Sequence, residues 1–260
     1  MNIFVQFYKS LYSPKDIARF RFQGIGKTIL YLFMLSLISV LPSLIYVNME
    51  ITAGVKAAKS TMNKDLPDFE IKDGVLTTKS SVPFLMKKDG FNIYLDSSGA
   101  VTEREVTNRG GSAIALLKDK MVFTAGGNTG SYEYSMARGM HITNKTALDA
   151  LNKIQSLYFI ILPALSLTIY CTAAASLFFQ ATIIALVGLF LASRMERRLQ
   201  YRHLWRLTAY SLTLATVFFT IMGFLQTNVV YKPFINWLVT LIILYLSIKE
   251  VPLPKQKPRD

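Results

Sequence analysis

The chain has 260 residues, of which 52% are hydrophobic and only 17% charged, yet its formal net charge is +13. Soluble domains carry about 25% charged residues, and disordered chains need low hydrophobicity, so neither class fits this composition. One cysteine, Cys171, excludes an intrachain disulfide framework and any Cys-rich metal site, and two histidines leave little for a zinc centre. We therefore expect no metal and no cofactor.

Residues 1–27 are predicted to form a cytoplasmic amphipathic segment on the membrane surface. A first helix would place one apolar stripe against the lipid. A second helix should start at Ser13 as N-cap, with Pro14 at its first position and Asp16 near its start. The stripe of the first helix contains Phe4, Phe7, Tyr8 and Leu11.

Four long stretches without a charged residue predict membrane spans, because a spanning helix needs roughly 20 apolar residues. The first, at 28–47, has the features of an uncleaved signal anchor. The longest, at 155–193, could be one long tilted helix or two pieces broken near residues 171–176. We favour the single helix. The predicted spans lie near 30–47, 170–192, 207–226 and 234–249.

The distribution of basic residues predicts the orientation of these spans. Residues 1–27, the link 194–206 and the end of the chain from Lys249 together hold fourteen Lys and Arg against four acids. Short loops rich in Lys and Arg stay in the cytoplasm. Four spans with both termini in the cytoplasm therefore fit best, in the plasma membrane, with a cytoplasmic tail at 250–260 and a transmembrane bundle at 157–249.

The link carries a basic cluster for which anionic lipid headgroups are the expected partner. This explains the positive charge without nucleic acid, and we expect no nucleic-acid binding. The cluster consists of Arg194, Arg197, Arg198, Arg202 and Arg206.

Residues 48–156 are expected to form a small, mostly β extracytoplasmic domain between the first and second spans. A hairpin is predicted over 66–76 with an Asp73-Gly74 turn, and a second one over 113–124. Other expected elements are a helical extension of the first span at 50–63, strands at 91–96 and 132–135, a loop at 126–130 and a helix at 144–156.

The outer domain offers few candidates for chemistry. Asp65, Asp68, Glu70 and Asp73 lie within nine residues, but their spacing is not that of a Ca²⁺ loop. Asp68 and Glu70 could share one strand face for acid–base work, although a solvated face opposite Phe69 and Ile71 explains them better. His141 has no ionisable neighbour in the sequence and is expected to be a surface or structural residue.

Inside the spans the sequence indicates close packing. No predicted span carries a charge in its interior, which disfavours a proton-coupled transporter. Small residues at helical spacing favour close helix contacts, within the chain or in a homodimer. The small residues are Ala181, Ala185, Gly188 and Ala192, and polar ones in the same stretch are Thr168, Tyr170, Thr172, Gln180 and Thr182.

Two groups of residues resemble one family. The first group runs into the first span and comprises Phe7, Ser10, Tyr12, Pro14, Ala18, Arg19, Gly24, Gly26 and Lys27; the second comprises Leu66, Pro67, Asp68, Phe69, Asp73 and Gly74. Together they are similar to domain-of-unknown-function family 1189, bacterial membrane proteins mostly from Firmicutes. The resemblance implies a membrane protein without assigned catalytic residues. Some members are labelled maltodextrin utilisation proteins, and the family is distantly similar to the Yip membrane family, which usually has five spans.

The expected protein is thus an α-helical polytopic membrane protein of about four spans with an inserted β domain. Its expected role is that of a non-enzymatic accessory or sensory protein whose outer domain binds a ligand or partner, with an oligosaccharide transporter as one candidate neighbour. A transporter or channel component is the alternative. A membrane-embedded enzyme is disfavoured, because no His or carboxylate pair lies inside the spans.

Overall fold

The computed structural model describes residues 2–64, 66–79, 82–88, 90–125, 127–137, 139 and 141–253. The chain divides into two compact units, one comprising Met1–Ile45 and Ala164–Asp260 and the other Tyr46–Pro163. Two long helices pass from one unit into the other, and each unit is described by itself below.

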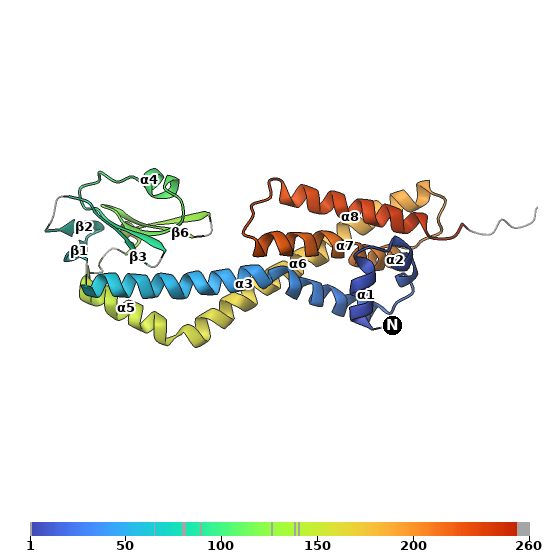
Figure 1. The fold of residues 1–260 in the computed structure, drawn as a ribbon, viewed down its shortest axis with the longest axis horizontal. Coiled ribbons are helices and arrows are strands. Elements are labelled where there is room, and N and C mark those ends of the chain that lie inside the picture. Colours follow the sequence, from blue (N-terminus) through green and yellow to red (C-terminus); the bar gives the residue numbers. More distant parts are fainter. Residues whose placement is uncertain are drawn as a thin grey trace, which may run out of the picture. The chain divides into compact units, whose positions relative to one another are not determined.

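The first unit is a helix bundle (Figure 1). Four of its helices are long and apolar enough to cross a membrane, by length and composition. Within the longest uncharged stretch, Tyr158–Arg194 form one helix without a break near residues 171–176, whereas residues 155 and 156 end the preceding helix. The helices are α1 (Ile3–Ser10), α2 (Pro14–Phe20), α3 (Ile25–Lys64), α6 (Tyr158–Arg194), α7 (Tyr201–Phe224) and α8 (Lys232–Lys249).

The two N-terminal helices begin and pack for identifiable reasons. Ser13 caps α2 by accepting from the Asp16 N–H, with Pro14 in the first turn, as predicted. In α1 the apolar side chains of Phe4 and Tyr8 are exposed. Phe7 of the predicted stripe instead packs against the bundle core, so the stripe is exposed only in part. On the buried side Gln6 Oε1 accepts a hydrogen bond of 3.4 Å from the Tyr210 hydroxyl. This contact follows only from the packing of α1 against α7.

Small residues let the long helices approach one another closely. Ala181, Ala185 and Ala192 of α6 are fully or almost fully buried. A Cβ added to Gly188 would lie 3.1 Å from Leu244 of α8 and 3.3 Å from Leu204 of α7. Of the two alternatives that the spacing left open, packing within the chain is the one observed for this face.

Hydrogen bonds bring three basic segments to one end of the bundle. The Arg206 guanidinium donates to the Arg21 carbonyl oxygen at 2.9 Å, and the Arg197 guanidinium donates to the Lys249 carbonyl oxygen at 3.2 Å. The end of the N-terminal segment, the α6–α7 link and the end of α8 therefore meet. Lys255, Lys257 and Arg259 of the predicted tail lie outside the described residues.

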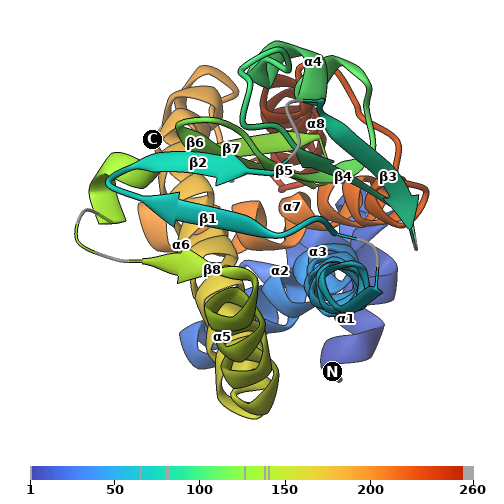
Figure 2. The same ribbon diagram turned by 90° about the vertical axis from the view of Figure 1, so that its left-hand side faces the viewer.

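The second unit contains two small sheets. The first has the strand order β2-β1-β8, and Figure 2 shows β1 between its two neighbours. The second has the order β3-β4-β5-β6-β7. The strands are β1 (Phe69–Lys72), β2 (Val75–Thr78), β3 (Phe84–Lys88), β4 (Phe91–Leu95), β5 (Ser112–Leu116), β6 (Lys120–Ala125), β7 (Asn128–Glu133) and β8 (Ile142–Thr143).

Both predicted hairpins are confirmed. In the first, β1 pairs with β2 around the Asp73-Gly74 turn, with Lys72 opposite Val75. In the second, β5 pairs with β6, with Leu116 opposite Met121. The predicted helical extension of the first span continues to Lys64, and the predicted helix α5 spans Asn144–Ser156.

The five-stranded sheet contains one parallel pair, β4 and β5. Parallel neighbours need a crossover connection, and this one contains α4 (Glu103–Asn108). Thr102 and Glu105 form a capping box at its start, a Thr-x-x-Glu signal of a helix N-terminus that is present in the sequence. Residues Val106 and Ala115 belong to the core beneath α4.

The predicted loop at 126–130 and strand at 132–135 are wrong in their boundaries. Among the described residues, Asn128–Glu133 form β7, and Tyr134–Ala137 form a short 3₁₀ helix; Gly126 lies outside the described part. The reason is that β7 is an edge strand, held by its main chain against β6. Its side chains are mostly exposed, so no apolar alternation marks it in the sequence.

Candidate functional site

A cleft of about 550 Å³ lies along the three-stranded sheet and the start of α5, and is termed the outer cleft. This volume is within the range of small-molecule sites, about 300–1,000 Å³. Almost all of its lining side chains are polar or charged. They are Asp68, Phe69, Glu70, Thr77, Thr78, Lys79, Thr143, Asn144 and Lys145.

Asn144 fixes the strand that carries the acidic residues. Its Oδ1 accepts from the Phe69 N–H at 2.8 Å, and its Nδ2 donates to the Pro67 carbonyl oxygen at 3.3 Å. Phe69 and Ile71 are then buried, as predicted, and each retains only 5% of its exposure. Because side chains alternate along a strand, Asp68 and Glu70 point to the other face, which lines the cleft.

The cleft carries charges of both signs. Lys79 Nζ lies 3.3 Å from Asp68 Oδ2, with both side chains largely exposed, so the pair contributes at most about 1 kcal/mol. Lys145 adds a second cation beside them. These charges therefore remain accessible to a bound molecule.

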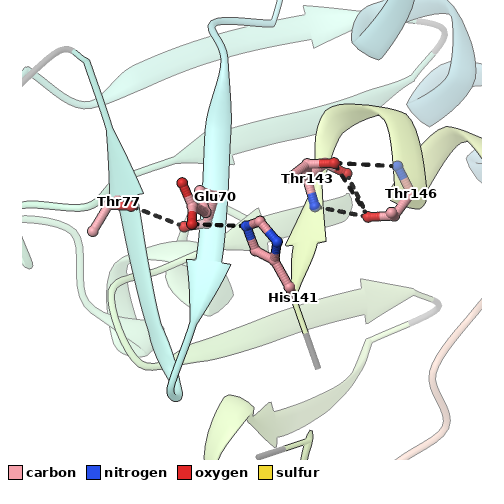
Figure 3. A network of polar contacts seen from close by, with 5 residues as sticks. All are labelled: Glu70, Thr77, His141, Thr143 and Thr146. Atoms are coloured by element: carbon pink, nitrogen blue, oxygen red, sulfur yellow. Dashed lines mark hydrogen bonds and ion pairs between the residues drawn. The ribbon is translucent and has the colours of Figure 1, made fainter. Parts of the chain in front are cut away.

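His141 has a carboxylate partner in space although it has none in the sequence. Its Nε2 lies 2.7 Å from Glu70 Oε1 (Figure 3). The pairing of β8 with β1 brings the two side chains together across 71 positions of sequence. It remains a surface residue, because 59% of its side chain is exposed.

The remaining polar groups of Figure 3 hold the backbone of the cleft. Thr143 and Thr146 cap the start of α5 reciprocally, and the Thr77 hydroxyl donates to the Glu70 carbonyl oxygen at 3.1 Å. The Thr77 contact joins β2 to β1. These residues fix the walls and leave the carboxylates and ammonium groups as the parts that can contact a ligand.

A second polar cavity, of about 500 Å³, lies between α3, α6, α7 and α8 and is termed the bundle crevice. Gln180 Nε2 donates to Asn236 Oδ1 at 2.7 Å across it. The Lys232 ammonium lies 5.6 Å from the centre of the Phe219 ring. Of the polar residues noted in the sequence, Thr168, Thr172 and Gln180 line the crevice.

The other two noted residues have structural roles. The Tyr170 hydroxyl donates to the Phe33 carbonyl oxygen at 3.3 Å, and the Thr182 hydroxyl accepts from the Trp205 indole at 3.3 Å. Asn236 and Thr216 of the crevice carried no signal in the sequence, because isolated polar residues in apolar helices are common. Only the structure, which brings both residues to the same crevice, identifies them as candidates for a binding site.

The basic cluster of the α6–α7 link divides into two sets. Arg197 and Arg206 donate to main-chain oxygens and tie the link to other helices. Arg194, Arg198 and Arg202 are exposed, and Arg194 lies over the Phe190 ring at 5.1 Å. The exposed set is the part available to lipid headgroups.

The comparison with protein families gives one match. The family described as "Protein of unknown function (DUF1189)" matches residues 4–248. The chain belongs to this family. No curated protein and no solved structure matches it.

Several residues of the family pattern have a clear structural position. In the N-terminal group, Pro14 begins α2, Arg19 lies 3.6 Å from Asp16 in the same helix, and Gly24 precedes α3. In the second group, Asp68 lines the outer cleft, the Phe69 N–H donates to the Asn144 side chain, and the Pro67 carbonyl oxygen accepts from it.

Gly74 has a φ of +84°, as the tight turn of the first hairpin requires, and a Cβ there would lie 3.5 Å from the Ser135 main chain. Its position in the family pattern is therefore accounted for by the backbone.

Proposed function

We propose that this protein is a non-enzymatic accessory or sensory membrane protein whose outer domain binds a polar ligand or partner in the outer cleft. The observation that carries the proposal is the convergence of Asp68, Glu70, Lys79 and Lys145 on one cleft of ligand size. Side-chain and main-chain bonds that do not involve these charged groups hold the backbone around them.

The proposed orientation places the outer domain outside the cell membrane and both termini in the cytoplasm. The support is that three basic segments meet at one end of the bundle. Lys and Arg in short loops favour the cytoplasmic side. The exposed arginines Arg194, Arg198 and Arg202 would then lie at the anionic headgroups of the inner leaflet.

The cleft suits a ligand rich in hydroxyl groups, such as an oligosaccharide. Carboxylates accept hydrogen bonds from hydroxyl groups, while ammonium groups donate to ring and hydroxyl oxygens. A link to maltodextrin uptake, or to a transporter as membrane partner, is part of this proposal.

A binding role fits better than catalysis. The Glu70–His141 pair is the one carboxylate–imidazole contact in the part of the chain that the structure describes. No described Ser, Thr or Cys hydrogen-bonds to the other imidazole nitrogen, so the pair lacks the nucleophile of a triad.

Photo-crosslinking in native membranes tests the proposal. A photoreactive residue at Lys79, in the cleft, should capture a ligand or partner that the same residue at Arg104, on the exposed side of α4, does not. Asp68→Asn should reduce the yield at Lys79 several-fold. Equal capture at both positions, or none at Lys79, would contradict a binding role for the cleft.

A transporter or channel component is the second candidate, and the bundle crevice favours it. Proteoliposomes that hold only this protein should take up solute if it transports alone. Absence of uptake, with crosslinking from the cleft intact, would decide for the accessory role.

A further inference from the structure

We propose that the bundle crevice binds an anionic lipid by its headgroup, with Lys232 facing the phosphate. The inference is independent of the outer cleft, because all the residues it uses belong to the helix bundle. The site lies between the membrane-spanning helices, and its occupant would enter from the surrounding bilayer.

The first support is an unpartnered buried group. Thr216 of α7 is one of the residues that line the crevice and retains 4% of its exposure. Its hydroxyl oxygen is buried beside the crevice and has no hydrogen-bond partner among the described residues. A buried hydroxyl without a hydrogen-bond partner carries a free-energy cost. In an apolar membrane a polar occupant of the crevice would remove this cost.

The second support is the set of donors and acceptors beside Thr216. Gln180 uses Nε2 and Asn236 uses Oδ1 in their mutual bond, which leaves Gln180 Oε1 and Asn236 Nδ2 without a described partner. The free amide N–H groups can donate to a phosphate, and the free carbonyl can accept from a headgroup hydroxyl. The crevice thus matches a group that carries both phosphate and hydroxyls.

The third support is the position of Lys232, the only cation among the described residues that line the crevice. Lys232 is the first residue of α8, and the Phe219 ring lies beneath its ammonium group. Ile169, which is partly exposed beside the buried Val40 and Leu177, gives the crevice an apolar side that an acyl chain can contact. A soluble anion would contact the Lys232 ammonium but not the apolar side of the crevice, so the lining favours a lipid.

Lipid titration by native mass spectrometry of the full-length protein in non-ionic detergent tests the inference. The probes are phosphatidylglycerol and phosphatidylcholine with identical acyl chains. The wild-type protein should prefer phosphatidylglycerol about tenfold, a difference of about 1.4 kcal/mol. With Arg194→Gln, Arg198→Gln and Arg202→Gln present, so that the exposed arginines of the link no longer attract the anionic lipid, Lys232→Gln should abolish the preference. In the same background Thr216→Val should weaken binding about threefold while the protein stays folded.

Lys249→Gln is the matched control, because it removes the same charge at the other end of α8. It should leave the preference unchanged. Equal binding of the two lipids by the wild type, or an equal loss in both lysine variants, would overturn the inference. Binding of inorganic phosphate that depends on Lys232 and displaces the lipid would overturn it as well, in favour of a soluble anion.

Discussion

At the scale of single residues, the buried carboxylate of Asp96 is matched by hydrogen bonds that local sequence only partly reveals. Asp96, at the end of β4, is 1% exposed, and its carboxylate accepts from the Ser98 N–H at 2.9 Å and the Val101 N–H at 2.7 Å. The Ser98 hydroxyl donates to the same carboxylate at 2.6 Å. Burial alone raises the pKa of this carboxyl, but these hydrogen bonds outweigh it and hold the pKa below its ordinary value.

Asp96→Ala should therefore destabilise the outer domain by about 2–3 kcal/mol, because it leaves buried donors unpaired. A group with a lowered folded pKa contributes fully above its unfolded pKa, about 3.9, and loses that contribution as the pH falls through the folded value. The difference in unfolding free energy between the wild-type protein and the variant should thus shrink below about pH 4. Limited proteolysis of the full chain across this range measures both effects; an advantage that persists unchanged at the lowest pH would contradict the role of the ionised carboxylate.

At the scale of elements, the sequence predicts helices and hairpins where local signals are strong. Ser13 and Pro14 mark the start of α2, and Asp73-Gly74 marks the first hairpin turn. The edge strand β7 lacks such a signal, because its order comes from pairing with β6. Elements held by neighbours are predicted less well than elements specified by their own caps and turns.

The face of α6 that contains Gly188 should tolerate little added volume. Gly188→Leu places a large side chain where Leu204 and Leu244 already approach, and such overpacking costs about 1–3 kcal/mol or more. Val187→Leu, at an exposed neighbouring position, is the control. Thermal unfolding in detergent should show a lower midpoint for the first variant only. Equal midpoints would mean that α6 does not pack there as described.

At the scale of the whole molecule, the basic segments indicate one orientation. The end of the N-terminal segment, the α6–α7 link and the end of α8 are joined by hydrogen bonds from Arg206 and Arg197. Charge alone predicts which side these segments occupy. Because these segments contact one another in the structure, their positive charges lie together at one end of the bundle.

Thiol labelling tests this orientation. In a Cys171→Ser background, Lys118→Cys, at the exposed turn between β5 and β6, should react with an impermeant reagent on intact cells. Arg198→Cys, in the α6–α7 link, should react only after lysis. The reverse pattern would place the outer domain in the cytoplasm and contradict the proposed topology.

The sequence by itself determined the apolar helices, the small-residue face of α6, both predicted hairpins and the capped helix starts. These features depend on neighbours along the chain, whose periodicity, turns and caps can be read directly. The tertiary structure alone decided the pairing of His141 with Glu70, the buried polar side of α1, and the convergence of Thr216, Gln180 and Asn236. Each of these joins residues far apart in the chain, so the physical cause is packing between elements, which no local pattern encodes.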